Sequence, residues 1–360
     1  MIAVRRLAQR HHGRTGSSFS SKKLNNYSPS SFLSSSTSPN SQKEDDKTNT
    51  ATILPTNRAA IDATTTSLGQ VIFLNSTKSG TAILASLAIG DPTLAVFAGL
   101  GAYTATITAQ FIGLNQQSCR DGLFGYNGAL IGCATSVFGP AFVPASVVYT
   151  MLGASATSVL CASLNEVLSQ PQWTWSFNIV ALTSILRLKP MTPAPDVSAT
   201  SLSNSVGVID YVTSPLVGIS QIFVVESALT GAGIVGSIGM YSPKLGVHAL
   251  GGSTLGCLVG LAFGAETSDV IAGLWGYNSA LASMAVGTFF VHSREAIALS
   301  AGSAAASAAL FGALQPVFGG LSAPCLTLPF CAVTSACYLL GGQIPGLKLA
   351  KEPHSPEKNS

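Results

Sequence analysis

Residues Gly122 to Asn165 decide the fold class, and they read GLFGYNGALIGCATSVFGPAFVPASVVYTMLGASATSVLCASLN. These 44 residues contain no Asp, Glu, Lys or Arg. A bilayer core about 30 Å thick needs roughly 20 apolar residues per helix, so the stretch is long enough for two crossings. It lacks the alternation of polar and apolar residues that an outer-membrane barrel requires, so we expect its crossings to be helical.

The shortage of charge extends over most of the chain. Charged residues make up 9% of the 360 residues, whereas ordinary soluble domains carry about 25%. Further windows without charge run from Pro92 to Cys119 and from Ala296 to Leu347. At about 25 to 30 residues per crossing and turn, the core has room for roughly ten spans. We therefore predict an all-α polytopic membrane protein, and reject a soluble protein with a large buried core.

Several functional classes do not fit this composition. A net charge of +3, contributed mainly by the N-terminal end, is too small for nucleic-acid binding. Seven cysteines are too dilute, and odd in number, for a secreted disulfide scaffold. The spans offer no paired acid and base, no metal cluster and no activated nucleophile. We expect no enzyme activity, no cofactor and no metal.

Composition divides the chain into five parts. Residues 1–63 are polar, and seven basic residues precede the first acid, Glu44. This composition is typical of a disordered cytoplasmic tail or of an organellar transit peptide. Two transmembrane repeats are expected at 64–188 and 215–347, joined by a linker at 189–214 and followed by a disordered tail at 348–360. We therefore expect an integral, multi-pass membrane protein. The plasma membrane is the favoured location, and an organellar membrane is the alternative.

The apolar core is an internal sequence duplication. With a shift of 151, 20 of the 69 positions from Gln70 to Phe138 are identical in the second copy without gaps. The segment GLFGYN at 122–127 falls on GLWGYN at 273–278. Further along the shift becomes 153, which places Thr174 on Thr327. Membrane proteins built from two homologous halves often place their solute site between the halves, at interrupted helices.

The order and duplication of these motifs resemble the urea transporter family. The motifs are the paired Gly-Leu-x-Gly-Tyr-Asn segments, QVIFLN at 70–75 and LTLPFC at 326–331, and the resemblance covers Leu68 to Leu347. It implies two inverted repeats of about five transmembrane helices, each repeat with a tilted re-entrant helix, and a pore between the repeats. It also implies a homotrimer and a passive, channel-like flux of urea.

The resemblance also implies the site residues, which fall at matched positions of the two halves. Gln70 and Gln221 would be the polar residues that bind the solute, and Thr174 and Thr327 would border the line of acceptor oxygens. The apolar slot around a planar solute would be lined by Val71, Phe73, Tyr126 and Leu130 in the first half and by Ile222, Tyr277 and Leu281 in the second.

Two departures from the family pattern are present. The first half reads Trp175-Ser176 where the family has Leu-Pro, which puts the break before this helix in question. Val224 stands where an aromatic partner of Phe73 is expected, which puts the symmetry of the slot in question.

The chemistry of these residues suits urea, a flat neutral molecule with four N–H donors and one acceptor oxygen. Removing urea from water without partners costs several kcal/mol in unmade hydrogen bonds. Gln and Thr supply neutral acceptors, which avoids the cost of desolvating a charge. The alternative is a channel of the same architecture for ammonia, short amides or water. Structural readings also remain: Gln can join helices, Tyr can simply pack, and Thr can bond to its own helix.

Overall fold

The structure is a computed structural model that describes residues 57–140, 142–188, 207–341 and 343–359. Most of the predicted N-terminal segment, residues 1–56, and linker residues 189–206 lie outside these ranges. The described residues form helices, with a single β-bridge between Phe290 and Leu349. In the first half the helices are α1 Asn57–Gln70, α2 Thr77–Gly90, α3 Pro92–Phe111, α4 Gln116–Arg120, α5 Tyr126–Phe138, α6 Val143–Val167 and α7 Trp175–Leu188. In the second half they are α9 Val208–Gln221, α10 Ala228–Tyr241, α11 Pro243–Ala262, α12 Thr267–Ile271, α13 Tyr277–Phe289, α14 Arg294–Gly320 and α15 Leu328–Gly341.

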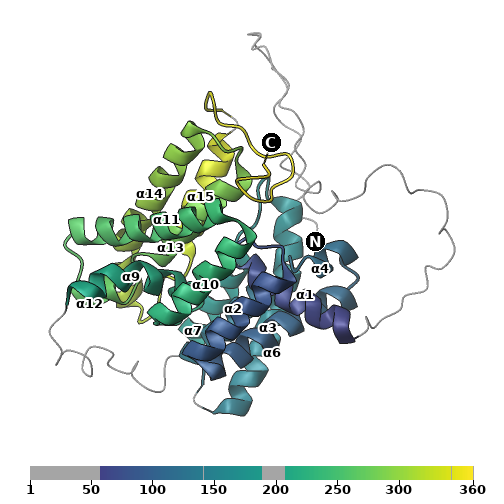
Figure 1. Ribbon diagram of the computed structural model, residues 1–360. Coiled ribbons are helices and arrows are strands. Elements are labelled where there is room, and N and C mark those ends of the chain that lie inside the picture. Colours follow the sequence, from purple (N-terminus) through teal and green to yellow (C-terminus); the bar gives the residue numbers. More distant parts are fainter. Residues whose placement is uncertain (1–56, 141, 189–206, 342, 360) are drawn as a thin grey trace, which may run out of the picture.

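Corresponding helices of the two halves have nearly the same length. The described helices contain 14, 14, 20, 5, 13, 25 and 14 residues in the first half and 14, 14, 20, 5, 13, 27 and 14 in the second. The duplicated sequence therefore forms a duplicated set of helices, and Figure 1 shows the two sets side by side. Helices α1 and α9 begin at 57 and 208, before the repeat boundaries at 64 and 215 that composition indicates. Their first turns carry the charged residues Arg58 and Asp210, which resemble tail sequence.

Matched polar residues start the helices. The side chains of Ser76 and Ser227 accept hydrogen bonds from backbone N–H groups in the first turns of α2 and α10, at 3.2 Å in both halves. Asp91 precedes Pro92 at the start of α3, and Ser242 precedes Pro243 at the start of α11. A short polar residue followed by Pro satisfies one exposed donor and removes another, so the start of each helix is fixed by local chemistry.

Four residues other than glycine adopt the left-handed backbone conformation at matched breaks. Phe73 and Val224, after α1 and α9, have φ of 66° and 61°. Trp173 and Leu326, before α7 and α15, have φ of 47° and 50°. This conformation costs an L-residue roughly 1–2 kcal/mol, and such outliers concentrate at functional sites. The chain is thus interrupted at equivalent places in both halves.

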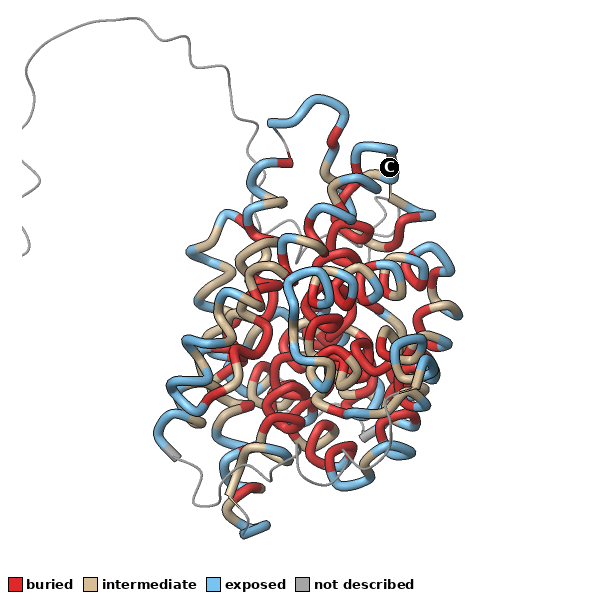
Figure 2. Tube along the Cα trace, turned by 90° about the vertical axis from the view of Figure 1, so that its left-hand side faces the viewer, coloured by how far each residue is buried: buried red, intermediate tan, exposed pale blue. Residues whose placement is uncertain are grey.

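A close crossing holds α1 against α2, and its equivalent holds α9 against α10. A Cβ atom at Gly80 would lie 1.7 Å from the carbonyl oxygen of Thr65, and one at Gly231 would lie 1.9 Å from that of Leu216. Only glycine permits this approach. Helices α2 and α10 then pack directly on each other, which joins the two halves. Figure 2 shows the buried residues concentrated in the middle of this assembly.

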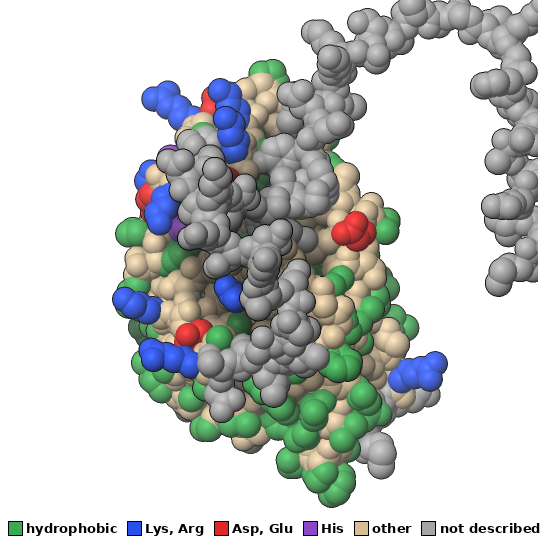
Figure 3. Space-filling model, turned by 90° about the vertical axis from the view of Figure 1, so that its right-hand side faces the viewer, with side chains coloured by type: hydrophobic (Ala, Val, Ile, Leu, Met, Phe, Trp, Pro, Cys, Tyr) green, Lys and Arg blue, Asp and Glu red, His purple; other side chains and the backbone are tan. Residues whose placement is uncertain are grey.

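Four described helices, α3, α6, α11 and α14, are long and apolar enough to cross a membrane. Helices α7 and α15 have 14 residues each, and about 1.5 Å per residue makes them shorter than a bilayer core of about 30 Å. Large apolar side chains face outward, including Phe111 at 81% exposure and Val247 at 71%. Figure 3 shows one face that is largely hydrophobic in its lower part, with most of its visible Lys and Arg side chains on the left-hand side.

Residues 348–359, expected as a disordered tail, pack against the end of α13. The backbone N–H of Val291 donates to the carbonyl oxygen of Lys348 at 2.8 Å, and that of Ala350 donates to Phe289 at 2.9 Å. The amide Nδ2 of Asn359 donates to the carbonyl oxygens of Gly287, Thr288 and Phe290. The last carbonyls of a helix lack partners within the helix. The segment is ordered because its polar groups satisfy them.

Candidate functional site

The two glutamines occupy equivalent positions at the ends of α1 and α9. Nε2 of Gln70 donates to the carbonyl oxygen of Asp121 at 2.8 Å, and Nε2 of Gln221 donates to that of Ala272 at 2.9 Å. Both acceptors precede the glycine that opens a Gly-Leu-x-Gly-Tyr-Asn segment. Because the amide nitrogen is used in this way, the carbonyl Oε1 of each half-buried glutamine is left as the acceptor for a further donor.

The two tyrosines also hold equivalent backbone carbonyls. The hydroxyl of Tyr126, at the start of α5, donates to the carbonyl oxygen of Trp173. The hydroxyl of Tyr277, at the start of α13, donates to that of Leu326 at 2.6 Å. Trp173 and Leu326 are the left-handed residues before α7 and α15. Each tyrosine therefore fixes the break before a short helix, which is a positioning role beyond packing.

The threonines meet where α7 and α15 begin. Oγ1 of Thr174 and Oγ1 of Thr327 lie 2.7 Å apart, within hydrogen-bond distance. Nδ2 of Asn178 donates to Oγ1 of Thr327 and to the carbonyl oxygen of Thr174, both at 2.9 Å. The backbone N–H of Thr327 donates back to Oδ1 of Asn178 at 3.1 Å. These buried groups form a neutral polar centre that links the two halves.

Aromatic side chains surround this centre. The ring of Phe73 meets the rings of Phe289 and Phe330 edge-on, with centroids 6.0 and 6.3 Å apart. Trp173 meets the same two rings at 4.9 and 6.1 Å. Phe73 thus finds partners in the second half, whereas Val224, its sequence counterpart, offers no ring. The aromatic part of the site is asymmetric.

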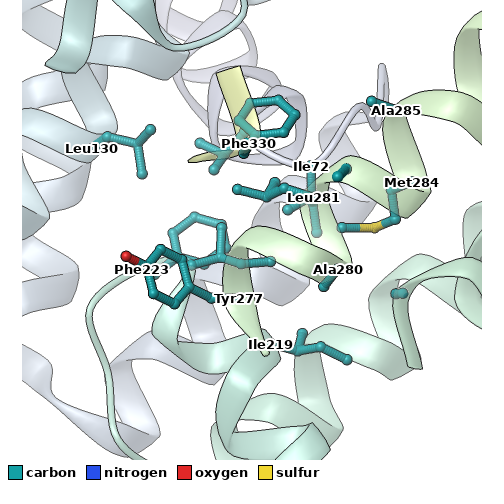
Figure 4. Close-up of a cluster of buried hydrophobic side chains, with 14 of the residues drawn as sticks. Ile72, Leu130, Ile219, Phe223, Tyr277, Ala280, Leu281, Met284, Ala285 and Phe330 are labelled. Carbon is teal, nitrogen blue, oxygen red and sulfur yellow. The ribbon is translucent and has the colours of Figure 1, made fainter. Parts of the chain in front are cut away.

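The remaining predicted slot residues are buried in the apolar core. Val71 and Ile222 are 3% and 2% exposed, and Leu130 and Leu281 are each 1% exposed. In Figure 4, Leu130 on α5 points toward the same interior region as Leu281 and Tyr277 on α13. The structure thus places all eleven predicted residues in the interior or at its edge.

Sequence reasoning missed the residues that complete the site. Oε1 of Gln172 accepts from the backbone N–H and the hydroxyl of Ser176, at 3.3 and 3.1 Å, and its Nε2 donates to the hydroxyl of Tyr126. Gln172 therefore caps the start of α7, so the break forms without the Pro of the family pattern. Asn178 was missed as well, although an amide one turn after Thr174 in an apolar helix is a readable signal.

Related proteins match this chain over most of its length. A family model described as "Urea transporter" matches residues 61–342. A protein named Urea transporter 1 from Ovis aries is 30% identical over 304 residues, which cover 78% of this chain and 77% of that protein. Its namesake from Rattus norvegicus is 30% identical over 317 residues, covering 81% and 80%.

Proposed function

Because the chain belongs to the urea transporter family, with residues 61–342 matching the family model, we propose that it moves urea across a membrane passively, as a channel. It is an integral, multi-pass, all-α membrane protein, as the charge pattern predicts. It is a member of a transporter family and not an enzyme. The proposal concerns the mechanism of transport and the residues that carry it.

The neutral polar groups of the site match the two ends of urea. Each NH₂ group of urea needs acceptor oxygens, which Oε1 of Gln70 and Oε1 of Gln221 supply at equivalent breaks in the two halves. The hydroxyls of Thr174 and Thr327 supply further acceptors, where the two halves meet. None of these groups carries a charge, so a hydrated ion gains nothing that offsets the loss of its water.

The direct contact between the two threonines carries the proposal. With the oxygens 2.7 Å apart, there is no room for a solute between these side chains, so a solute that passes here must separate them. A urea molecule that enters can exchange the Thr174–Thr327 hydrogen bond for bonds from its own N–H groups. Exchanging one hydrogen bond for another changes the free energy of binding by only about 1 kcal/mol. The site therefore binds urea weakly, so that urea can leave it as well as enter.

Flux measurements on the purified chain in liposomes test this mechanism. We expect uptake of isotopic urea that does not change with pH or with a sodium gradient. Gln70→Leu and Gln221→Leu remove the acceptors while retaining side-chain volume, so each should lower the urea flux about tenfold, the effect of about 1.4 kcal/mol. Normal flux in both variants at equal protein abundance would contradict the assignment of the glutamines.

A parallel series with ammonia, formamide, acetamide and water separates urea from the alternative solutes. If one of these moves faster than urea, and the glutamine substitutions reduce that flux instead, the alternative channel is correct. The exposed Gln343 offers a matched control, because Gln343→Leu makes the same chemical change at a side chain that donates to the carbonyl oxygen of Leu339, outside the site. Its flux should equal that of the unmodified protein.

The larger assembly is also part of the proposal. We place transmembrane repeats at 64–188 and 215–347, with opposite orientation in the membrane, and three chains in the functional particle. The paired helices support the two repeats. Light scattering of the detergent-solubilised protein should give three times the chain mass of 36.7 kDa after subtraction of bound detergent. For the membrane address we favour the plasma membrane, and imaging of a C-terminal tag distinguishes it from an organelle.

A further inference from the structure

A cavity of about 340 Å³ lies between α11, α13 and α14, away from the proposed solute site. Its polar lining residues are Lys244, His248, Ser283, His292 and Ser300. At about 30 Å³ per water, the volume equals roughly ten waters, which is room for a phosphate group with its glycerol. None of these side chains takes part in the solute site described above.

The polar side of the cavity consists of hydrogen-bonded side chains and a lysine. Nδ1 of His248 lies 2.8 Å from the hydroxyl of Ser300, and that hydroxyl lies 2.8 Å from the hydroxyl of Ser283. Lys244 stands in the first turn of α11, and its ammonium group makes no ion pair among the described residues. The nearby carboxylate of Glu357 accepts hydrogen bonds from the hydroxyl of Ser242 and the backbone N–H of Lys244. Glu357 keeps its negative charge, but it is held against the start of α11 and does not line the cavity.

The other side of the cavity is apolar and open outward. Val247 and Ile297 line it and are 71% and 49% exposed. They belong to α11 and α14, two of the helices long enough to cross a membrane. Lys244 lies in the first turn of α11, and His292 lies just before α14, where a span would meet the headgroup region. The cavity thus has a basic end at the interface and an apolar end toward the acyl chains.

The first half of the chain lacks these features, although its helices correspond. The counterparts of Lys244, His248, Gly251 and Ser300, found by the shift of 151, are Thr93, Phe97, Leu100 and Tyr149. A charge is therefore missing there, and large side chains stand where the second half has small ones. The duplicated fold therefore does not by itself require a basic lining at this place, and the second half carries one.

We propose that this cavity binds the headgroup of an anionic phospholipid from the surrounding membrane. The phosphate lies near Lys244 and His292, within reach of the hydroxyl groups of Ser283 and Ser300. The upper acyl carbons run outward between Val247 and Ile297. An ammonium group attracts the headgroup of an anionic lipid, and charge-assisted hydrogen bonds to the phosphate oxygens add specificity for the phosphate.

Lipid retention by the full-length protein tests the proposal. The protein is equilibrated with equal amounts of phosphatidylglycerol and phosphatidylcholine of the same acyl chains, and bound lipid is counted by native mass spectrometry. We expect at least fivefold more phosphatidylglycerol than phosphatidylcholine. Lys244→Thr and Gly251→Leu reproduce the first half at these positions. Each should reduce the amount of bound phosphatidylglycerol at least fivefold.

Two matched controls isolate the cavity. Arg58→Thr removes the same charge from an exposed position on α1, and Gly302→Leu adds the same side chain to α14 outside the cavity. A Cβ at Gly251 or at Gly302 meets no atom within 4 Å, so both leucines can be accommodated. The proposal is overturned if the controls lose as much lipid as the cavity variants, or if neither set loses any. It is equally overturned if soluble glycerol phosphate displaces the lipid at the same concentration, because the site then binds an anion alone.

Discussion

At the scale of single residues, the centre of the molecule depends on a few neutral polar atoms in apolar surroundings. Asn178 and Cys331 occupy equivalent positions, and both lie within hydrogen-bond distance of the threonine hydroxyls. Only Asn178 also accepts a backbone hydrogen bond across the halves, from Thr327. The amide therefore orients the threonine of the opposite half, because one side chain both donates to its hydroxyl and accepts from its backbone.

Removing one threonine hydroxyl should weaken transport more than it weakens the fold. Thr327→Val keeps the shape but loses an acceptor for urea and the partner of Thr174. With about 1–2 kcal/mol lost where urea passes, we expect the urea flux to fall about tenfold or more. Stopped-flow uptake in liposomes measures this. Thr254→Val, an exposed position whose hydroxyl bonds only to its own helix at Leu250, is the control and should leave the flux unchanged. Equal fluxes for the two variants would contradict a role for Thr327.

At the scale of elements, the two halves start the same short helix by different means. Pro329 has no N–H group, so the second position of α15 needs no acceptor. Its counterpart Ser176 does have an N–H group, and Gln172 accepts its hydrogen bond. Both solutions leave no unpaired N–H group at the second position of the short helix, although the sequences differ.

This equivalence predicts a rescue between two substitutions. Gln172→Leu leaves the N–H group of Ser176 without its acceptor and should lower the free energy of unfolding by about 1–2 kcal/mol. Adding Ser176→Pro removes that donor and copies the second half, so it should recover about half of the loss. Thermal unfolding in detergent gives the four values of the double-mutant cycle. Strictly additive losses would show that Gln172 does not act through the start of α7.

At the scale of the whole molecule, the halves are joined at two interfaces and covered unequally. Helix α2 packs on α10, and α7 meets α15. The segment 348–359 packs on elements of the second half, where His354 stacks on Tyr241 with ring centroids 5.2 Å apart and an interplanar angle of 2°. The duplicated bundle therefore carries one single-copy feature at its C-terminal end.

Docking of this segment should weaken in mild acid. Burial lowers the pKa of His354 below its ordinary value of 6.5, the charge of Lys358 lowers it further, and Glu357 opposes them. A lowered histidine pKa means that docking favours the neutral ring. The stabilisation is therefore complete above pH 6.5 and is lost as the pH falls through the lowered value. Hydrogen exchange of residues 348–359, corrected for intrinsic rates, should become faster between pH 7.5 and 5.5.

The control for this pH effect is His354→Phe, which keeps a ring against Tyr241 but cannot titrate. Its protection should stay constant over the same range. Glu357 does not interfere, because hydrogen bonds from Ser242 and Lys244 outweigh burial and lower the pKa of its carboxyl below 4.5. An unchanged pH response in the variant would remove His354 as the cause.

The orientation of the repeats gives a second test at this scale. Gln117 and Ser268 are exposed at equivalent positions of α4 and α12. In opposed repeats, Gln117→Cys and Ser268→Cys should react with a membrane-impermeant thiol reagent from opposite sides of sealed vesicles. The native cysteines are buried except Cys337, which is partly exposed and is replaced by Ser in both variants. Labelling of both positions from one side would mean that the repeats run parallel.

The sequence alone determined the membrane class, the duplication and the family resemblance. Long stretches without charge, such as Gly122 to Asn165, are a local property, since every residue of a span must tolerate lipid. The repeat shift also paired Thr174 with Thr327 before any contact was known. These features can be read along the chain because neighbouring residues, or a constant spacing, carry them.

Only the tertiary structure decided which atoms meet. The contact of Thr327 with Asn178 joins residues 149 positions apart, and the stacking of His354 on Tyr241 joins residues 113 apart. The cap that Gln172 provides, the ordered segment 348–359 and the basic cavity beside His248 are of the same kind. Hydropathy and repeat spacing describe what a residue tolerates, whereas its hydrogen-bond partner is fixed by how distant helices pack, and that geometry has no local signature in the chain.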